Sequence, residues 1–131
     1  MIYIDTSALY ALLDRCDRRH LQARDAWFEW SALKERFVTS NYVVVESLAL
    51  IRHRLGVEAA RRFQVDFTPV LHIHWITPDL HAVGVAQLLA DARRELSLVD
   101  CTSFAVMRAL NLTDAFAFDQ HFVEQGFRCL P

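Results

Sequence analysis

The sequence predicts an α/β fold: a three-layer α/β/α sandwich with a short, mostly parallel central sheet. Two observations lead to this prediction. Short apolar runs typical of buried strands alternate along the chain with longer segments of helical spacing, and only three glycines and three prolines interrupt them. Strands that alternate with helices of ten or more residues form βαβ units, which place helices on both faces of a parallel sheet.

Local signals justify each element in order. The strands are apolar or alternating runs, predicted at 2–4, 36–40, 70–77, 114–118 and, at the sheet edge, 127–130. The helices carry apolar residues three or four positions apart, and they are predicted at 7–14, 18–35, 41–55, 57–67, 79–94 and 100–111. Thr6 or Ser7 can cap the first helix and Asp17 the second, while Gly56 ends the third and Pro69 follows the fourth.

Composition limits the class of protein. The 131 residues are 53% hydrophobic and contain no repeat or linker, so we expect a single domain over residues 1–131. The net charge of −2 does not by itself indicate nucleic acid, although Lys34 is the only lysine among fourteen basic residues. Three cysteines without a CxxC motif favour a reducing compartment. With no signal peptide and no apolar run of ~20 residues, we expect a cytoplasmic protein with no membrane contact.

Two acids stand directly after predicted strands. Asp5 follows the strand at 2–4, and Asp119 follows the strand at 114–118 in "AFAFDQHF". A lone buried carboxylate is energetically costly, so such an acid needs a partner, a metal ion or open water. In open parallel sheets, ligands bind beyond the carboxyl ends of the strands. We therefore expect these two side chains to meet at that edge.

Two further acids fit the same place. Glu46 lies one helical turn past the second strand with apolar residues on both sides, and Asp100 opens a helix, where the helix dipole favours a carboxylate. Each acid also has an ordinary interpretation: Asp100 as an N-cap, Glu46 as a solvated helix position and Asp119 as a turn residue. Clustered carboxylates repel one another, and Mg²⁺ or Mn²⁺ would relieve that repulsion and could activate water against a phosphodiester.

Four stretches resemble the blocks of the PIN domain, in order and at similar spacing. They are "IDTSAL", "TSNYVVVE", "SLVDCTSFAVM" and "AFAFDQHFVEQGF". Within that family the chain is most similar to the VapC-type toxins of bacterial toxin–antitoxin pairs. The resemblance covers essentially the whole chain, and its last two blocks are the most specific.

The resemblance implies a metal-dependent endoribonuclease on a three-layer α/β/α fold. Carried over block by block, the catalytic and metal-binding acids are Asp5, Glu46, Asp100 and Asp119, with Mg²⁺ or Mn²⁺ as the cofactor. The hydroxyl that supports the first acid would be Thr6 or Ser7. The implied partners are an RNA substrate and a small antitoxin protein, and we also expect a homodimer.

One position departs from the family pattern. Many members have Ser, Thr or Asn two residues before the last acid, where this chain has Ala117. A supporting hydrogen bond to Asp119 is therefore in question, and a PIN-like binding or scaffold module that has lost its chemistry is the alternative function. Asp114 is a nearby acid that we assign to the turn before the strand.

Two other acid-rich α/β classes do not fit. A phospho-accepting receiver domain needs a lysine near the last strands, but Lys34 is the only lysine. A haloacid-type phosphatase begins with a DxD motif, whereas "DTS" stands at that place.

Other reactive residues are assigned structural roles. His72 and His74 share a strand face without an evident third metal ligand, and Cys101 lacks a neighbouring base. His121 is assigned to the start of a surface helix. Arginine clusters could grip RNA phosphates, the best placed being those at 15–24 after the first helix. Trp27 and Trp30 lie three apart on one helix face, which favours core packing or, as a second interpretation, contact with a partner.

Overall fold

Five short strands form one sheet at the centre of the molecule. The computed structural model describes residues 1–131. The strands are β1 (Ile2–Ile4), β2 (Phe37–Ser40), β3 (Leu71–His74), β4 (Asp114–Phe116) and β5 (Arg128–Leu130), in the spatial order β3-β2-β1-β4-β5. All four neighbouring pairs are parallel. The predicted α/β class is confirmed, and the strand order reverses beside β1, where such sheets bind ligands.

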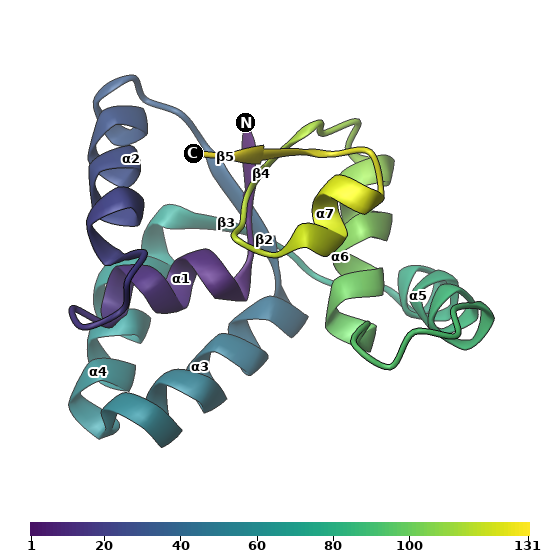
Figure 1. Cartoon of the computed structure of the whole chain (residues 1–131), viewed down its shortest axis with the longest axis horizontal. Helices are drawn as coiled ribbons and strands as arrows, with labels where there is room; N and C mark the ends of the chain where they lie inside the picture. The colour runs from purple at the N-terminus through teal and green to yellow at the C-terminus, as the bar shows by residue number, and fades with distance from the viewer.

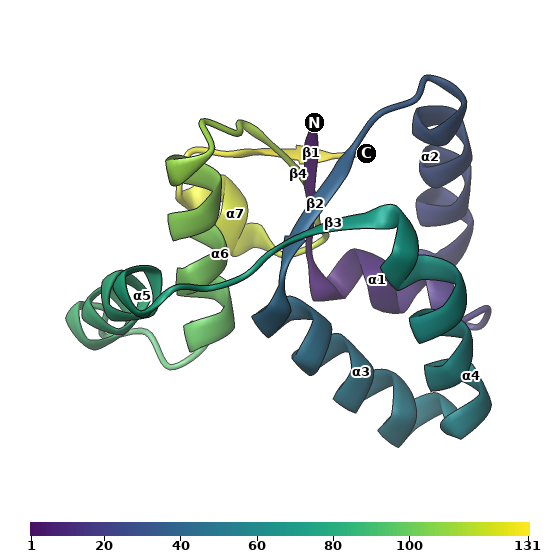
Figure 2. The ribbon, with the colours of Figure 1, turned by 180° about the vertical axis from the view of Figure 1, so that it is seen from behind.

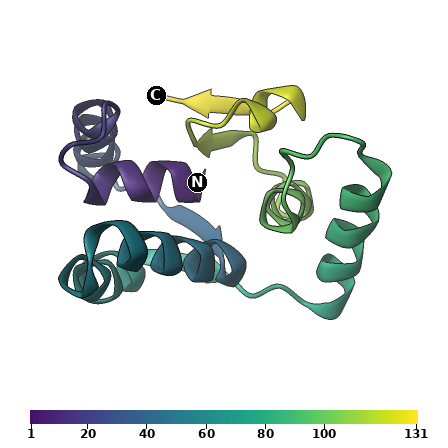
Figure 3. The same ribbon diagram turned by 60° about the horizontal axis from the view of Figure 1, so that its bottom comes forward.

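Seven helices cover the two faces of the sheet (Figures 1 and 2). On one side lie α1 (Thr6–Leu13), α2 (His20–Ala32), α3 (Asn41–Leu55) and α4 (Val57–Arg62). On the other side lie α5 (Pro78–Ala90), α6 (Leu98–Ala109) and α7 (Gln120–Glu124). The view in Figure 3 shows α5 as the outermost helix, next to α6. None of these helices has the length and apolar character that crossing a bilayer would require.

The central strand is buried on both faces, as its sequence predicts. Ile2, Tyr3 and Ile4 are 5% exposed or less, because helices cover both sides of β1. Tyr3 carries the one polar group in this strand, and its hydroxyl donates to Ser103 Oγ on α6 at 2.8 Å. Thr39 on β2 donates from Oγ1 to the carbonyl oxygen of Ile4 at 2.8 Å. Both bonds cross between elements and satisfy polar groups that burial would otherwise penalise.

Several helix starts differ from their predicted positions. The side chain that caps α1 is that of Asp5, which accepts the N–H of Ser7, rather than the hydroxyl of Thr6 or Ser7. α2 begins at His20 and has no side-chain cap, because Asp17 instead accepts the N–H of Arg19 at 2.7 Å in a turn before the helix. α6 begins before Asp100, at Leu98.

Several helix and strand ends also differ, among them that of β4, which stops at Phe116 rather than at residue 118, so Asp119 does not directly follow the strand. The helix predicted at 57–67 is an α-helix only to Arg62 and continues as a π-helix (Phe63–Phe67) and a 3₁₀ turn (Thr68–Val70). The helix predicted to reach 94 ends at Ala90. β3 stops at His74 rather than at residue 77. Past that point the N–H of Ile76 donates to the side chain of Asn41 at 2.7 Å, so a side chain satisfies it instead of a neighbouring strand.

Candidate active site

The four acids come from four segments that meet at the carboxyl edge of the sheet. This edge is the lower one in Figure 1, where α1, α3 and α6 all begin. Asp5 directly follows β1, and Asp119 lies just beyond β4 at the start of α7. Glu46 lies in the second turn of α3 and Asp100 in the first turn of α6. The acids therefore reach this edge from both helical layers and from the sheet itself.

Asp5 is the most deeply buried of the four acids. Its residue is 4% exposed, and its Oδ2 atom accepts two hydrogen bonds from Ser7, from the backbone N–H at 3.1 Å and from Oγ at 2.8 Å. Burial raises the pKa of Asp5 to about 7, the Ser7 bonds oppose this rise, and the charges of Asp100 and Asp119 add to it. Near neutral pH this carboxyl group is therefore poised between its two protonation states.

Glu46 and Asp100 are supported by different neighbours. Burial raises the pKa of Glu46, a hydrogen bond with Thr6 opposes the rise, and the charges of Asp100 and Asp119 add to it. Asp100 takes part in a capping box with Ser97: its N–H donates to Ser97 Oγ at 3.1 Å, and its Oδ2 accepts the Ser97 N–H at 3.0 Å. Burial raises the pKa of Asp100 as well, and the charge of Asp119 adds to that rise.

Asp119 stands on the open side of the site. It caps α7, where its Oδ1 accepts the N–H of His121 at 2.9 Å, and its side chain is 30% exposed. Ala117 is buried and lines a small cavity of about 130 Å³ together with Asp119. An alanine side chain cannot hydrogen-bond to that carboxylate. The polar support expected at position 117 is absent, and the backbone of α7 orients Asp119 instead.

The four carboxylates interact without forming a closed metal cage. Asp100 and Asp119 each raise the pKa of both Asp5 and Glu46, and Asp119 also raises that of Asp100, so Asp100 and Asp119 interact electrostatically with each other and with the other two acids. No three His, Cys, Asp or Glu side chains converge closely enough to hold an ion by themselves. The four acids themselves offer only oxygen donors, which hard divalent cations prefer.

A match to a known family accompanies this geometry. Residues 2–127 match the PIN domain. The chain belongs to the PIN-domain family. It is 36% identical over 128 residues to the 23S rRNA-specific endonuclease VapC20 of Mycobacterium tuberculosis, a match that covers 97% of this chain and 95% of that protein. The resemblance to PIN domains of the VapC type, expected from the sequence blocks, is confirmed.

Solved structures agree with this assignment. The crystal structure of M. tuberculosis VapC20, described as a Sarcin-Ricin loop cleaving toxin, matches with a TM-score of 0.86 at 36% identity and covers 97% of this chain and 96% of that one. The crystal structure of FitAcB from Neisseria gonorrhoeae matches with a TM-score of 0.72 at 19% identity, over 100% of this chain and 97% of that one. The second match shows the shared PIN fold alone.

Two buried serines that support the PIN-domain site were missed from the sequence. Ser47 on α3 donates to Thr6 Oγ1 at 3.2 Å, and Ser103 accepts from Tyr3 beneath the site. His121 lies beside the acids, and its charge opposes the rise in the pKa of Asp100. The signal for Ser103 was a pair of hydroxyl residues inside an otherwise apolar run, "CTSF" at 101–104, and Ser47 is a single hydroxyl residue in the apolar stretch around Glu46. Hydroxyl side chains at such places need buried partners.

Asp114, Cys101 and the two histidines of β3 have surroundings unlike those of the four acids. Asp114 begins β4 at the opposite end of that strand, and its carboxylate accepts two bonds of 2.8 Å from Arg128, which lower its pKa. Burial raises the pKa of Cys101, so its thiol is not activated. His72 and His74 lie on β3, the edge strand beyond β2.

Proposed function

We propose that this PIN domain is a metal-dependent endoribonuclease toxin, and that Asp5, Glu46, Asp100 and Asp119 form its catalytic metal site. The observation that carries the proposal is the gathering of four carboxylates, each from a different segment, at the carboxyl edge of the sheet. The 36% identity to an rRNA-specific endonuclease supports it. In this reaction water attacks phosphorus in line, which breaks the bond to the 3′ oxygen and leaves 5′-phosphate and 3′-hydroxyl ends.

We propose Mg²⁺ or Mn²⁺ as the cofactor. The site offers only oxygen donors and does not enclose an ion, which suits cations that keep several water ligands. Such an ion, when bound, lowers the pKa of a water molecule and stabilises the leaving oxygen. The chain itself fixes the acids: Ser7 holds Asp5, and Ser97 holds Asp100.

The relative supports a proposal for the substrate class. Because VapC20 is a 23S rRNA-specific endonuclease described as cleaving the Sarcin-Ricin loop, we propose ribosomal RNA as the substrate and the cytoplasm as the location. Ribosomes and protein-free 23S rRNA are therefore the first substrates to test. Cleavage of ribosomal RNA at a single position would support a specific target. Indiscriminate degradation would support nuclease activity without that specificity.

The decisive experiment compares the wild type with Asp100→Asn. Asparagine keeps an oxygen that can accept the Ser97 N–H, so the capping box and the fold should survive. We expect cleavage with Mg²⁺ or Mn²⁺, none in EDTA, and at least a hundredfold loss in Asp100→Asn. If folded Asp100→Asn cleaves at the wild-type rate, Asp100 has no metal role. If the wild type binds its partner but cleaves no RNA under any condition, the scaffold alternative replaces the nuclease.

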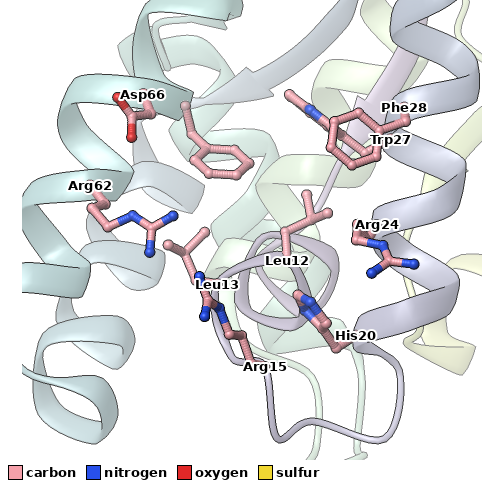
Figure 4. A pocket seen from close by; sticks show the side chains of 10 residues that line it. Leu12, Leu13, Arg15, His20, Arg24, Trp27, Phe28, Arg62 and Asp66 are labelled. Carbon is pink, nitrogen blue, oxygen red and sulfur yellow. The ribbon is translucent and has the colours of Figure 1, made fainter.

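We further propose an antitoxin contact at a hollow between α1, α2 and the π-helix (Figure 4). This hollow has a volume of about 700 Å³. Its apolar walls include Trp27 and Phe28, and three arginines surround them: Arg15, Arg24 and Arg62. An amphipathic segment with acidic side chains fits this combination. Trp30 is less suitable as a contact than the sequence suggested, because its ring packs edge-on against Phe116 at 4.9 Å.

Phe28 provides the cleaner test, because it is 64% exposed. Expression of the wild type alone should stop growth, and the protein encoded beside it should rescue growth. Phe28→Ala should remain toxic and resist that rescue. If Phe28→Ala is rescued as readily as the wild type, the antitoxin binds at another surface. If the wild type cleaves RNA in vitro but does not slow growth at high expression, the protein is a nuclease and not a toxin.

A homodimer through α5 is also proposed. This outermost helix exposes apolar side chains, among them Val83 at 54% and Leu89 at 80%. Light scattering after gel filtration should give twice the monomer mass of 15.1 kDa for the wild type and the monomer mass for Leu89→Asp. A dimer that persists in Leu89→Asp would exclude α5 as the interface.

A further inference from the structure

A basic hollow lies beside the acidic site and shares one residue with it. Its volume is about 300 Å³. The residues that carry the argument are Ser7, Tyr10, Asp17, Arg18, Arg19 and Arg54. Arg19 precedes α2, and Arg54 lies in the last turn of α3. Elements distant in sequence thus bring three guanidinium groups to one place.

Aromatic rings hold two of these arginines. The guanidinium of Arg19 lies 4.9 Å from the ring centroid of Phe118, and that of Arg54 lies 5.4 Å from the ring centroid of Tyr10. None of the three arginines forms an ion pair with a carboxylate. The side chain of Arg54 is also within hydrogen-bonding range of the Tyr10 hydroxyl. A guanidinium whose plane is fixed in this way can still direct its remaining N–H donors at a phosphate.

Ser7 joins the hollow to the acids. Its Oγ donates to Asp5 Oδ2 at 2.8 Å and accepts the N–H of Phe118 at 3.0 Å, and the same residue lines the hollow. The three arginines of the hollow therefore lie next to the four acids of the site. Asp17 is the one acid in the hollow, and its Oδ1 already accepts the N–H of Arg19. The carboxylates repel the phosphates of an RNA strand that crosses them. Arginine side chains on one side of the scissile phosphate can offset that repulsion.

We propose that Arg19 and Arg54 form a phosphate-binding subsite that holds the RNA backbone on one side of the scissile phosphate. The proposal rests on the endoribonuclease function. These arginines position the substrate and take no part in bond breaking. Loss of either should therefore weaken RNA binding and raise KM, while kcat changes little.

The first measurement is equilibrium binding of a fluorescent single-stranded RNA to the protein in EDTA over a range of salt concentrations. We expect Arg19→Gln and Arg54→Gln each to weaken binding about tenfold and to reduce the slope of log K against log salt by roughly 0.7. The double variant should reduce the slope by roughly 1.4. Arg61→Gln is the matched control, since Arg61 is an exposed arginine on α4 that does not line the hollow.

The second measurement is RNA cleavage with metal present. The Gln variants should show a raised KM at nearly unchanged kcat, and Arg54→Lys should fall between wild type and Arg54→Gln. If the Gln variants are folded and their salt slopes equal that of the control, the subsite is wrong even when the wild type cleaves RNA. If the wild type cleaves no RNA but the slopes differ as expected, the subsite holds and the nuclease assignment fails. Loss of antitoxin rescue with unchanged RNA binding would assign the hollow to a protein partner and overturn the proposal.

Discussion

Asp5 has two tasks that conflict electrostatically. It caps α1 from a buried position, and it stands beside Asp100 and Asp119, whose charges raise its pKa. Its position could be predicted from the sequence, because it directly follows an apolar strand. The choice between Thr6 and Ser7 as its support could not be predicted. Adjacent residues in the first helical turn point in different directions, and only the packing of α3 and β4 decides that Ser7 faces Asp5 while Thr6 faces Glu46.

Asp5→Asn should change how stability depends on pH. The pKa of Asp5 is about 7 in the folded chain and near 3.8 in the unfolded chain. The folded chain therefore binds the extra proton between these values, and stability falls as pH rises from about 4 to about 7. Asparagine carries no charge, so the variant should equal the wild type near pH 4 and exceed it by roughly 2–4 kcal/mol at pH 8 in EDTA. Urea unfolding at several pH values measures this. A variant less stable than wild type at pH 8 would contradict it.

Ser7→Ala should move the pH dependence of cleavage. The bond from Ser7 Oγ favours the ionised form of Asp5, so its loss raises the pKa of Asp5 further. The acidic limb of the pH–rate profile should then shift to higher pH, and the fold should lose about 1 kcal/mol. Ser7→Thr keeps the hydroxyl group and serves as the control. Superimposable profiles for Ser7→Ala and wild type would show that the bond does not tune Asp5.

At the level of elements, the order of strands and helices followed from periodicity, but several ends did not. α6 starts at Leu98 because Ser97 and Asp100 form a capping box, whose S-x-x-D signal is visible in the sequence. The π-helix (Phe63–Phe67) has no such signal, since its residues continue the apolar spacing of α4. β3 ends early because a side chain from α3 replaces a strand partner, which is a tertiary effect.

Gly84→Ala should destabilise the protein through the contact between α5 and α6. A Cβ atom at Gly84 would lie 2.5 Å from Thr102 Cγ2 and 3.3 Å from the backbone nitrogen of Thr102. The helix propensity of alanine would favour the variant by about 1 kcal/mol, whereas overpacking costs about 1–3 kcal/mol. We expect a net loss of up to roughly 2 kcal/mol, measured by urea unfolding.

Thr102→Ser offers a matched test of that contact. Serine keeps the hydroxyl that bonds the carbonyl oxygens of Leu98 and Val99 but removes the clashing methyl group. The cost of Gly84→Ala should shrink by about half or more in this background, because only the backbone contact remains tight. An equal cost in both backgrounds would mean that the methyl group is not what Gly84 accommodates.

For the whole molecule, the four acids come from segments of different layers that meet at this edge. Asp5 follows the central strand, Glu46 belongs to one helical layer, and Asp100 belongs to the other. A cation bound among them would contact the folded arrangement only, because the unfolded chain does not hold these acids together. Binding should therefore raise stability by mass action, and it should also remove the mutual repulsion of the carboxylates.

Melting curves in EDTA, Mg²⁺ and Mn²⁺ test this linkage. At a metal concentration one hundred times Kd the fold should gain about 2.7 kcal/mol, which for a domain of this size shifts Tm upward by on the order of 5–10 °C. Asp100→Asn should melt at or slightly above the wild-type temperature in EDTA, since one crowded charge is gone, and should respond much less to either metal. Ca²⁺ at equal ionic strength separates specific binding from screening. Identical midpoints for the wild type in EDTA, Mg²⁺ and Mn²⁺ would show that the four acids do not bind the ion together, because an ion that joined these segments could not leave the unfolding equilibrium unchanged.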